Sequence, residues 1–319
     1  MNRAVKILGV VTTIGMFLVL VAGATVTNTG SEHGCGRSWP LCHGQLVPHF
    51  AVTTMIEFIH RVDAAVETVL ILLFAAGVLY LYRRRIEMRV LVILMVVFLF
   101  LQAGLGAWAV MEPTEAAVLA LHFGVSLVAF ASVLLTTILL FEIDGSERLR
   151  ALPLPRSYRW AVWGLAIYTY AVVYSGAYVR HTNADDGCTG WPRCNGAFLP
   201  GLHGKVTSNF GHRVGAGLLT LAVIALVLWT ARLRAERPDL FRGSLFVLAG
   251  VSAQALAGAA VAWTNMDLFA ALAHAATVGL MFGALTYMCI HVLALNPEPR
   301  EVSRRTVVSA AGDSAAASQ

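Results

Sequence analysis

Four histidines inside apolar segments are the residues of this sequence best placed to do chemistry. His60 and His122 recur, at one constant offset, as His212 and His274. Two imidazoles that face each other in a helix bundle can ligate haem iron from both sides. An ionisable side chain at such a depth in a membrane is costly and usually functional. The pattern therefore predicts two bis-histidine haem sites, one in each half of the chain.

A structural role is the competing interpretation, because a lone histidine in a helix commonly hydrogen-bonds to a neighbouring helix. The repeat argues against it, since other residues recur at the same offset. Trp39-Pro40, Gln102 and Gly106 correspond to Trp191-Pro192, Gln254 and Gly258. Gly104, Gly106 and Gly258 leave room for a flat macrocycle or serve ordinary close packing of helices. The absence of a Cys-x-x-Cys-His motif from the sequence excludes covalent c-type haem attachment.

Arg61 and Arg213 directly follow two of these histidines, near the predicted aqueous boundary. A guanidinium group at that place can pair with the propionates of a haem. The alternative is that both arginines snorkel toward the membrane interface. We favour the first interpretation, which makes Arg61 and Arg213 candidate cofactor-binding residues.

Glu57 breaks the repeat, because the corresponding residue of the second half is Asn209. It lies one helical turn before the first histidine, so both side chains share a face. A carboxylate beside a haem pocket can act as an acid or a base. The alternative is a capping box formed with Thr54 at the helix start. Asp63 and Glu67 also lack counterparts; they either pair with neighbours or line a proton route, and both interpretations stay open.

Four of the cysteines lie in two long polar loops. Cys35 and Cys42 lie in the first loop, and Cys188 and Cys194 lie in the second. Both loops fall on the side predicted to be oxidising, so we expect the disulfides Cys35–Cys42 and Cys188–Cys194. Each disulfide is either a structural clamp or a redox-active pair. Cys289 is expected to be a buried spectator.

Membrane-spanning helices are needed to position these residues. Of the 319 residues, 58% are hydrophobic and 13% are charged, and the mean hydropathy is +0.71. Stretches long enough to cross a hydrocarbon core of about 30 Å fall at 7–27, 55–82, 90–111, 116–141, 161–181, 209–231, 243–264 and 268–294. The sequence predicts an all-α membrane protein with eight transmembrane helices. Two four-helix bundles of the same orientation would be related by a pseudo-twofold axis.

The basic residues predict the orientation in the membrane. They cluster at the N-terminus, in the even-numbered loops and after the last span, so both termini are expected to be cytoplasmic. The two cysteine loops then lie on the extracytoplasmic side. This topology explains the net charge of +5, which gives no indication of nucleic-acid binding.

Four segments are expected along the chain. They are an N-terminal bundle at 1–145, a cytoplasmic linker at 146–160, a C-terminal bundle at 161–295 and a disordered cytoplasmic tail at 296–319. Pro153 and Pro155 interrupt helix formation in the linker, and the tail has too little apolar surface to pack. The first span has an alternative as a signal peptide, since Ala22-Gly23-Ala24 resembles a cleavage site. The recurrence of Gly23-Ala24 as Gly176-Ala177 favours a retained helix.

The sequence resembles the haem A synthase family over residues 1–295. The resemblance is carried by Gly34–Cys42, Glu57–Arg61, Ala120–Phe123, Gly176–Thr182, Gly211–Arg213 and Ala273-His274. Together these motifs are highly specific, whereas the four histidines alone are moderately so.

The resemblance implies an oxidoreductase of the bacterial cell membrane that converts the C8 methyl group of haem O to the formyl group of haem A for terminal oxidases. It implies a haem B cofactor on His212 and His274, and a substrate haem on His60 and His122. Glu57 would be needed for catalysis. The implied partners are haem O and haem A, haem O synthase, and an electron donor or acceptor of the respiratory chain.

Two other classes of protein share some of these features. A di-haem electron-transfer protein of the cytochrome b type commonly places its haems toward opposite membrane faces, whereas all four histidines here lie toward the outer side. A transporter built from parallel repeats would need charged or broken helices near the midplane. Only Asp63 and Glu67 come close to that description.

Overall fold

The described part of the chain is built from long helices joined by loops. The computed structural model describes residues 2–112, 115–142 and 154–293, and eight helices within these residues are long and apolar enough to cross a membrane. They are α1 (Asn2–Asn28), α2 (Val52–Tyr82), α3 (Ile86–Met111), α4 (Ala116–Glu142), α6 (Arg156–His181), α7 (Gly204–Ala231), α8 (Pro238–Trp263) and α9 (Leu268–His291). A short 3-10 helix, η1 (Asp185–Gly187), lies between α6 and α7. The predicted all-α class with eight spans is confirmed.

Several helices begin before the apolar stretch that predicted them. α6 starts at Arg156 rather than near 161, and α7 starts at Gly204 rather than near 209. Hydropathy marks the hydrocarbon core, whereas a helix continues into the headgroup region, where polar residues are tolerated. The end of the predicted linker, 156–160, is therefore helical. Residues 146–153 of that linker and the predicted tail 296–319 lie outside the described residues.

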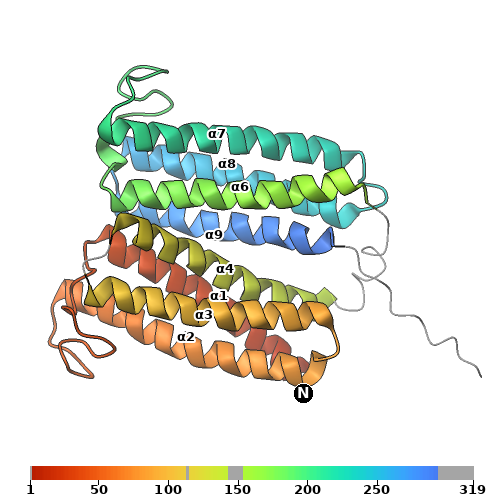
Figure 1. The fold of residues 1–319 in the computed structure, drawn as a ribbon, viewed down its shortest axis with the longest axis horizontal. Coiled ribbons are helices and arrows are strands. Elements are labelled where there is room, and N and C mark those ends of the chain that lie inside the picture. The colour runs from red at the N-terminus through yellow and green to blue at the C-terminus, as the bar shows by residue number, and fades with distance from the viewer. Residues whose placement is uncertain (1, 113–114, 143–153, 294–319) are drawn as a thin grey trace, which may run out of the picture.

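The helices form two groups, α1 to α4 and α6 to α9 (Figure 1). α4 lies where the groups meet, because 78% of its most apolar window is buried, against 39% for α9. It packs against α6 and α9, while α1 packs against α9. The packing is close: a Cβ placed on Gly124 of α4 would lie 2.6 Å from Tyr170 Oη of α6. The domain bounds and the pseudo-twofold relation stay predictions.

Polar contacts join the two groups at both ends of this shared surface. At the end of the long loops, Arg180 of α6 donates from Nη2 to Thr27 O at 3.0 Å and from Nε to Asn28 Oδ1 at 3.1 Å. At the other end, His291 Nε2 of α9 lies 3.1 Å from Glu142 Oε2 of α4. The two groups are thus linked by polar contacts at both ends.

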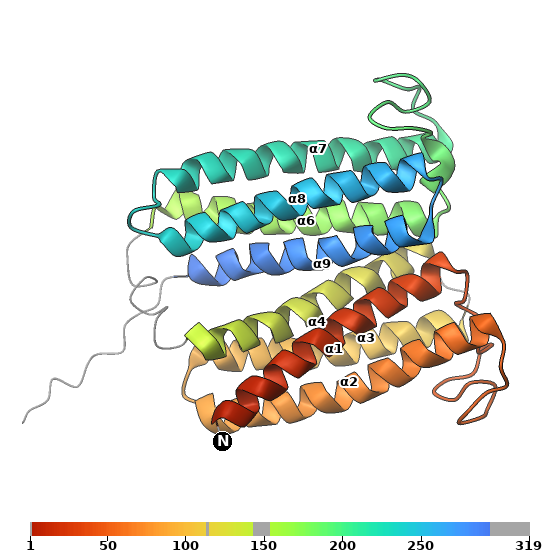
Figure 2. The ribbon, with the colours of Figure 1, turned by 180° about the vertical axis from the view of Figure 1, so that it is seen from behind.

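Both long loops project from one end of the bundle, and the N-terminus lies at the other end (Figures 1 and 2). They comprise residues 29–51, between α1 and α2, and residues 182–203, between α6 and α7. The two cysteine pairs therefore lie at the same end, as the sequence predicts. Which end is extracytoplasmic stays a prediction.

Most hydroxyl side chains in the spans are satisfied within their own helix. Thr13, Ser132 and Thr169 each donate to the carbonyl four residues earlier, at 2.7, 2.8 and 2.8 Å. Such bonds are expected because lipid offers no hydrogen-bond partner. Buried polar atoms without any partner are exceptional. Within the described residues they include three histidine nitrogens and one oxygen of Glu67.

Candidate functional site

Each of the four histidines packs against a glycine on the preceding helix of the chain. A Cβ built on that glycine would lie 2.7 to 3.3 Å from the Cε1 atom of the imidazole. The four contacts are Gly23 with His60, Gly106 with His122, Gly176 with His212, and Gly258 with His274. These glycines therefore make room for the imidazole rings. Gly104 has no such contact, since a Cβ there would meet nothing within 4 Å.

The histidines come together within each half, as predicted. His60 of α2 and His122 of α4 are close enough to interact electrostatically, and so are His212 of α7 and His274 of α9. All four side chains are partly accessible, although they lie in membrane-spanning helices. Each half thus presents two imidazoles toward shared space between its helices.

Hydrogen bonding distinguishes the two histidine pairs. The rings of His60 and His122 make no hydrogen bond to a described residue, and their Nδ1 atoms are fully buried. In the second pair, His212 Nδ1 lies 3.0 Å from Ser175 Oγ, and His274 Nε2 accepts from Gln254 Nε2 at 3.1 Å. The structural interpretation, a histidine bonded to the next helix, therefore does not hold for the first pair.

The donor set fits an iron porphyrin. Neutral imidazole is the commonest nitrogen ligand for haem iron, and each half supplies two such rings with a glycine that accommodates each one. His60, His122 and His212 have an Nε2 atom free of hydrogen bonds among the described residues. His274 differs, because iron binding at its Nε2 would require the Gln254 amide to turn away.

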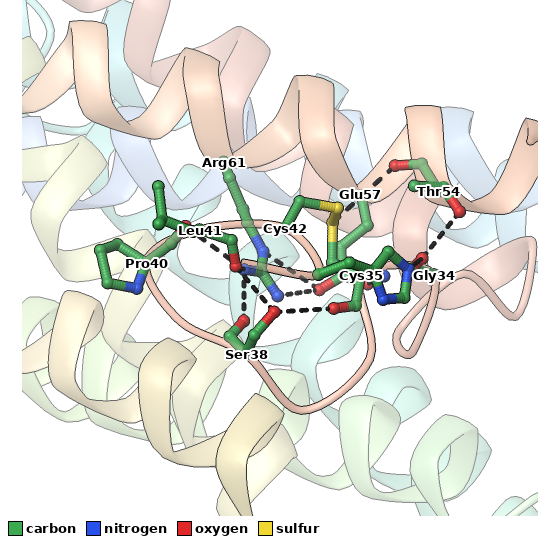
Figure 3. The surroundings of a disulfide bond; sticks show 10 residues. Gly34, Cys35, Ser38, Pro40, Leu41, Cys42, Thr54, Glu57 and Arg61 are labelled. Atoms are coloured by element: carbon green, nitrogen blue, oxygen red, sulfur yellow. Dashed lines mark hydrogen bonds and ion pairs between the residues drawn. A yellow bond between two sulfur atoms is a disulfide. The ribbon is translucent and has the colours of Figure 1, made fainter. Parts of the chain in front are cut away.

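Glu57 lies under the first cysteine loop, where it joins that loop to α2 (Figure 3). Its side chain is 3% exposed, and its Oε2 accepts from the backbone N–H of Cys35 at 2.8 Å. Its Oε1 accepts from Arg61 Nε at 3.1 Å. Thr54 donates to Gly34 O at 2.7 Å instead of capping the helix, and α2 begins earlier, at Val52. The capping-box alternative for Glu57 is therefore wrong.

Arg61 and Arg213 both bind the cysteine loop of their own half. Arg61 Nη1 donates to Ser38 O at 2.7 Å and to Leu41 O at 3.1 Å (Figure 3). Arg213 donates from Nη1 to Gly190 O at 2.7 Å and from Nη2 to the carbonyl of Cys188 at 2.9 Å. These guanidinium groups are engaged with loop backbone at the loop ends of α2 and α7; their pairing with haem propionates and the snorkelling alternative both stay predictions.

The exchange of Glu57 for Asn209 reverses the polarity of the contact with the loop. Asn209 is also buried, and its Oδ1 accepts from Arg213 Nε at 2.9 Å, as Glu57 accepts from the matching arginine. Its Nδ2, however, donates to the carbonyls of Ala184 and Asp185 at 2.9 and 3.0 Å. The first loop thus offers an N–H to a carboxylate, and the second loop offers carbonyls to an amide.

Both predicted disulfides are present. Cys35 is joined to Cys42, and Cys188 is joined to Cys194, and all four cysteines are buried. Cys289 is free and buried, as expected. The backbone N–H of Cys35 donates to Glu57, so one residue of the first disulfide is bonded to that carboxylate through its main chain.

Sequence reasoning missed several contacts of these sites. Ser175 was not recognised as a partner of His212, nor Thr277 as the residue that donates to Gln254 Oε1. The repeat register contained a signal for both, because their counterparts in the first half are the apolar Ala22 and Val125. No comparable signal exists for the backbone N–H of Cys35, since every residue except proline carries this group and the sequence does not show which one makes a contact.

Eight membrane-spanning helices that carry two matched histidine pairs beneath two disulfide loops define a multi-pass membrane protein with two candidate haem sites. A family model described as "Cytochrome oxidase assembly protein" matches residues 49–286. The relatives named Heme A synthase include those of Bacillus licheniformis (42% identical, covering 92% of this chain and 97% of the relative), Symbiobacterium thermophilum (39%, 94% and 99%) and Geobacillus kaustophilus (40%, 99% and 97%). The chain belongs to the haem A synthase family.

Proposed function

We propose that this protein is an oxidoreductase that converts the C8 methyl group of haem O to a formyl group, giving haem A. The N-terminal half would hold the substrate haem on His60 and His122, and the C-terminal half would hold haem B on His212 and His274. The relatives named Heme A synthase match nearly the whole chain, which supports the reaction. The observation that carries the division of labour is the difference between two otherwise matched sites.

The second histidine pair is equipped to keep a cofactor. Ser175 holds the ring of His212 by its Nδ1 and leaves Nε2 free for iron. Thr277 fixes the Gln254 amide, which would turn from Nε2 of His274 when iron binds there. Hydrogen bonds to the ligands of a metal fix their orientation and strengthen binding. In the first half, Gln102 is present but its Oε1 is buried without a partner. The imidazole rings of His60 and His122 are held by fewer hydrogen bonds, which suits a site where substrate haem must enter and product haem must leave.

The residues around Glu57 suit a site of chemistry. Bound haem B would supply one-electron redox chemistry, which amino-acid side chains lack. Glu57 lies one helical turn from His60, and its carboxylate is oriented by Arg61 and the Cys35 amide. We assign Glu57 to proton transfer during methyl oxidation. Arg61 and Arg213 act in this proposal by fixing the loops over the two sites and by pairing with haem propionates.

Production of haem A from supplied haem O tests the proposed function. The protein would be expressed in cells that make haem O but have no enzyme for haem A, and extracted haems would be separated by chromatography. We expect haem A together with haem B. A coloured protein that contains only b-type or O-type haem would instead indicate a di-haem electron carrier, and transport of haem without conversion would indicate a transporter.

The hydrogen-bonded shell of the second pair gives a prediction of its own. Ser175→Ala should weaken retention of haem B roughly tenfold or more, since hydrogen bonds to the ligands of a metal contribute about that much to its affinity. Haem B loss to an external haem-binding protein would be timed by absorbance. The matched control is Ala22→Ser, at the corresponding place of the first half, which should leave haem B retention unchanged. Equal retention in all three proteins would contradict the role assigned to this shell.

A further inference from the structure

Two acidic residues of α2 lie beyond His60, deeper in the membrane. Asp63 follows His60 by three residues and Glu67 by seven, so all three lie on one face of the helix. Glu67 is only 3% exposed, and its Oε1 is fully buried without a hydrogen bond. Within the described residues neither carboxyl forms an ion pair or a hydrogen bond with another side chain. An unpaired acid at this depth is costly, which marks it as functional.

The neighbouring helix is shaped to admit the carboxyl group of Glu67. A Cβ placed on Gly15 of α1 would clash with Glu67 Oε2 and would lie 3.0 Å from its Cδ. Thr12, one turn away on α1, is fully buried, and its hydroxyl also has no partner. Among the described residues, α1 and α2 therefore each carry one buried oxygen without a partner, in contrast to the hydroxyls that bond within their own helix.

In the second half, other side chains fill the space that corresponds to the contact of Gly15 with Glu67. The register that matches Gly23 with Gly176, and His60 with His212, sets Tyr168, Gly215 and Leu219 against Gly15, Asp63 and Glu67. Tyr168 Oη donates to Gly215 O at 3.1 Å, and Leu219 is 3% exposed. In the second half, the side chains of Tyr168 and Leu219 thus occupy the space that Asp63 and Glu67 occupy in the first half. The fold itself does not require the acids.

The charged residues of the packed helices lie far from Glu67. α2 packs against α1 and α3, whose charged residues, Arg3, Lys6, Glu87 and Arg89, all lie near the helix ends opposite the long loops. Lys6 is nine residues before Gly15, a rise of roughly 13 Å along a helix, and it lies over the ring of Phe141. The charged or titratable groups nearest to Glu67 along its own helix are Asp63, Arg61 and His60, and Arg61 is paired with Glu57.

We propose that Glu67, with Asp63, is a proton-exchange site that serves the haem of the N-terminal half; this inference rests on the proposed function. The acid pair takes up one proton from water when the haem receives one electron from an external redox donor, and it releases that proton when the haem is oxidised; neither carboxyl group changes its oxidation state. An electron added to an iron porphyrin in a low-dielectric interior adds charge that is weakly screened. Proton uptake by the acid pair compensates that charge, and proton release accompanies oxidation.

The pH dependence of the two haem midpoint potentials tests this inference in the purified, haem-loaded protein. Proton-coupled reduction gives a slope of up to about 59 mV per pH unit, the value for a tenfold change in a one-electron equilibrium. We expect this slope at the haem held by His60 and His122, and a much smaller one at the other haem. Glu67→Leu, which copies Leu219 and should therefore fold, is expected to flatten the first slope. Glu67→Asp should restore it.

Infrared difference spectra between reduced and oxidised protein give a second readout. We expect a band of a protonated carboxyl group that shifts in D2O and is absent from Glu67→Gln. A potential independent of pH in the native protein overturns the inference, and so does a slope unchanged in Glu67→Leu together with a band unchanged in Glu67→Gln. Haem A in the same extract would leave the proposed function standing. A preparation with neither haem A nor a haem on His60 and His122 overturns both.

Discussion

His212→Ala is expected to lose haem B, by roughly tenfold or more relative to the native protein, whereas His60→Ala keeps haem B and loses haem of the O and A types. An imidazole ligand contributes more to iron binding than the outer-shell bonds whose removal costs about tenfold. The two histidines belong to separate pairs, with His212 held by Ser175 and His60 free of hydrogen bonds. Haem extraction and chromatography of each purified variant measure both losses.

His203→Ala is the matched control for this pair of variants. His203 is exposed in the second loop, directly before α7, so its replacement should leave every pigment in place. Equal loss of all haems from His212→Ala and His60→Ala would contradict separate roles for the two halves.

Glu57→Gln should abolish most haem A formation, by about 100-fold or more, the range over which a positioned acid or base acts. The amide group of glutamine can still accept from Arg61, but its NH2 would oppose the N–H of Cys35 that now donates to Oε2. The spectrum of haem B should be unchanged, because Glu57 belongs to the other half. Chromatography of extracted haems and an absorbance spectrum of the same sample measure the two effects.

Glu57→Asp separates charge from geometry in this experiment. It keeps the carboxylate with a shorter reach, so we expect part of the haem A formation to survive. Normal haem A production in Glu57→Gln would remove Glu57 from the mechanism and leave it a purely structural link between the first loop and α2.

The sequence was a good guide where single side chains in a regular pattern decide the outcome. The apolar stretches predicted all eight helices, and the loop cysteines predicted both disulfides. The pairing of His60 with His122, and of His212 with His274, followed from the repeat. The helix starts were less well predicted, as at Arg156, because hydropathy does not detect a helix that continues outside the hydrocarbon core.

Contacts made by loop backbone could not be predicted in the same way. Arg61 and Arg213 were expected to face a cofactor, yet their donors reach the carbonyls of Ser38 and Gly190 across more than 20 residues of chain. Such contacts depend on the path of an irregular loop, which hydropathy and spacing do not encode. The polar shell of His212 was accessible in principle, since comparing the two copies reveals Ser175 opposite an alanine.

The central claim is that two matched sites hold different haems. Its most direct test is to measure how many haems the purified native protein binds and which ligands each iron has. Electron paramagnetic resonance and near-infrared magnetic circular dichroism would be recorded on protein from cells that supply haem O. We predict two low-spin haems, each with two imidazole ligands, one extractable as haem B and the other as haem O or haem A. A colourless protein, or a single haem whose ligation survives in both His60→Ala and His212→Ala, would contradict it.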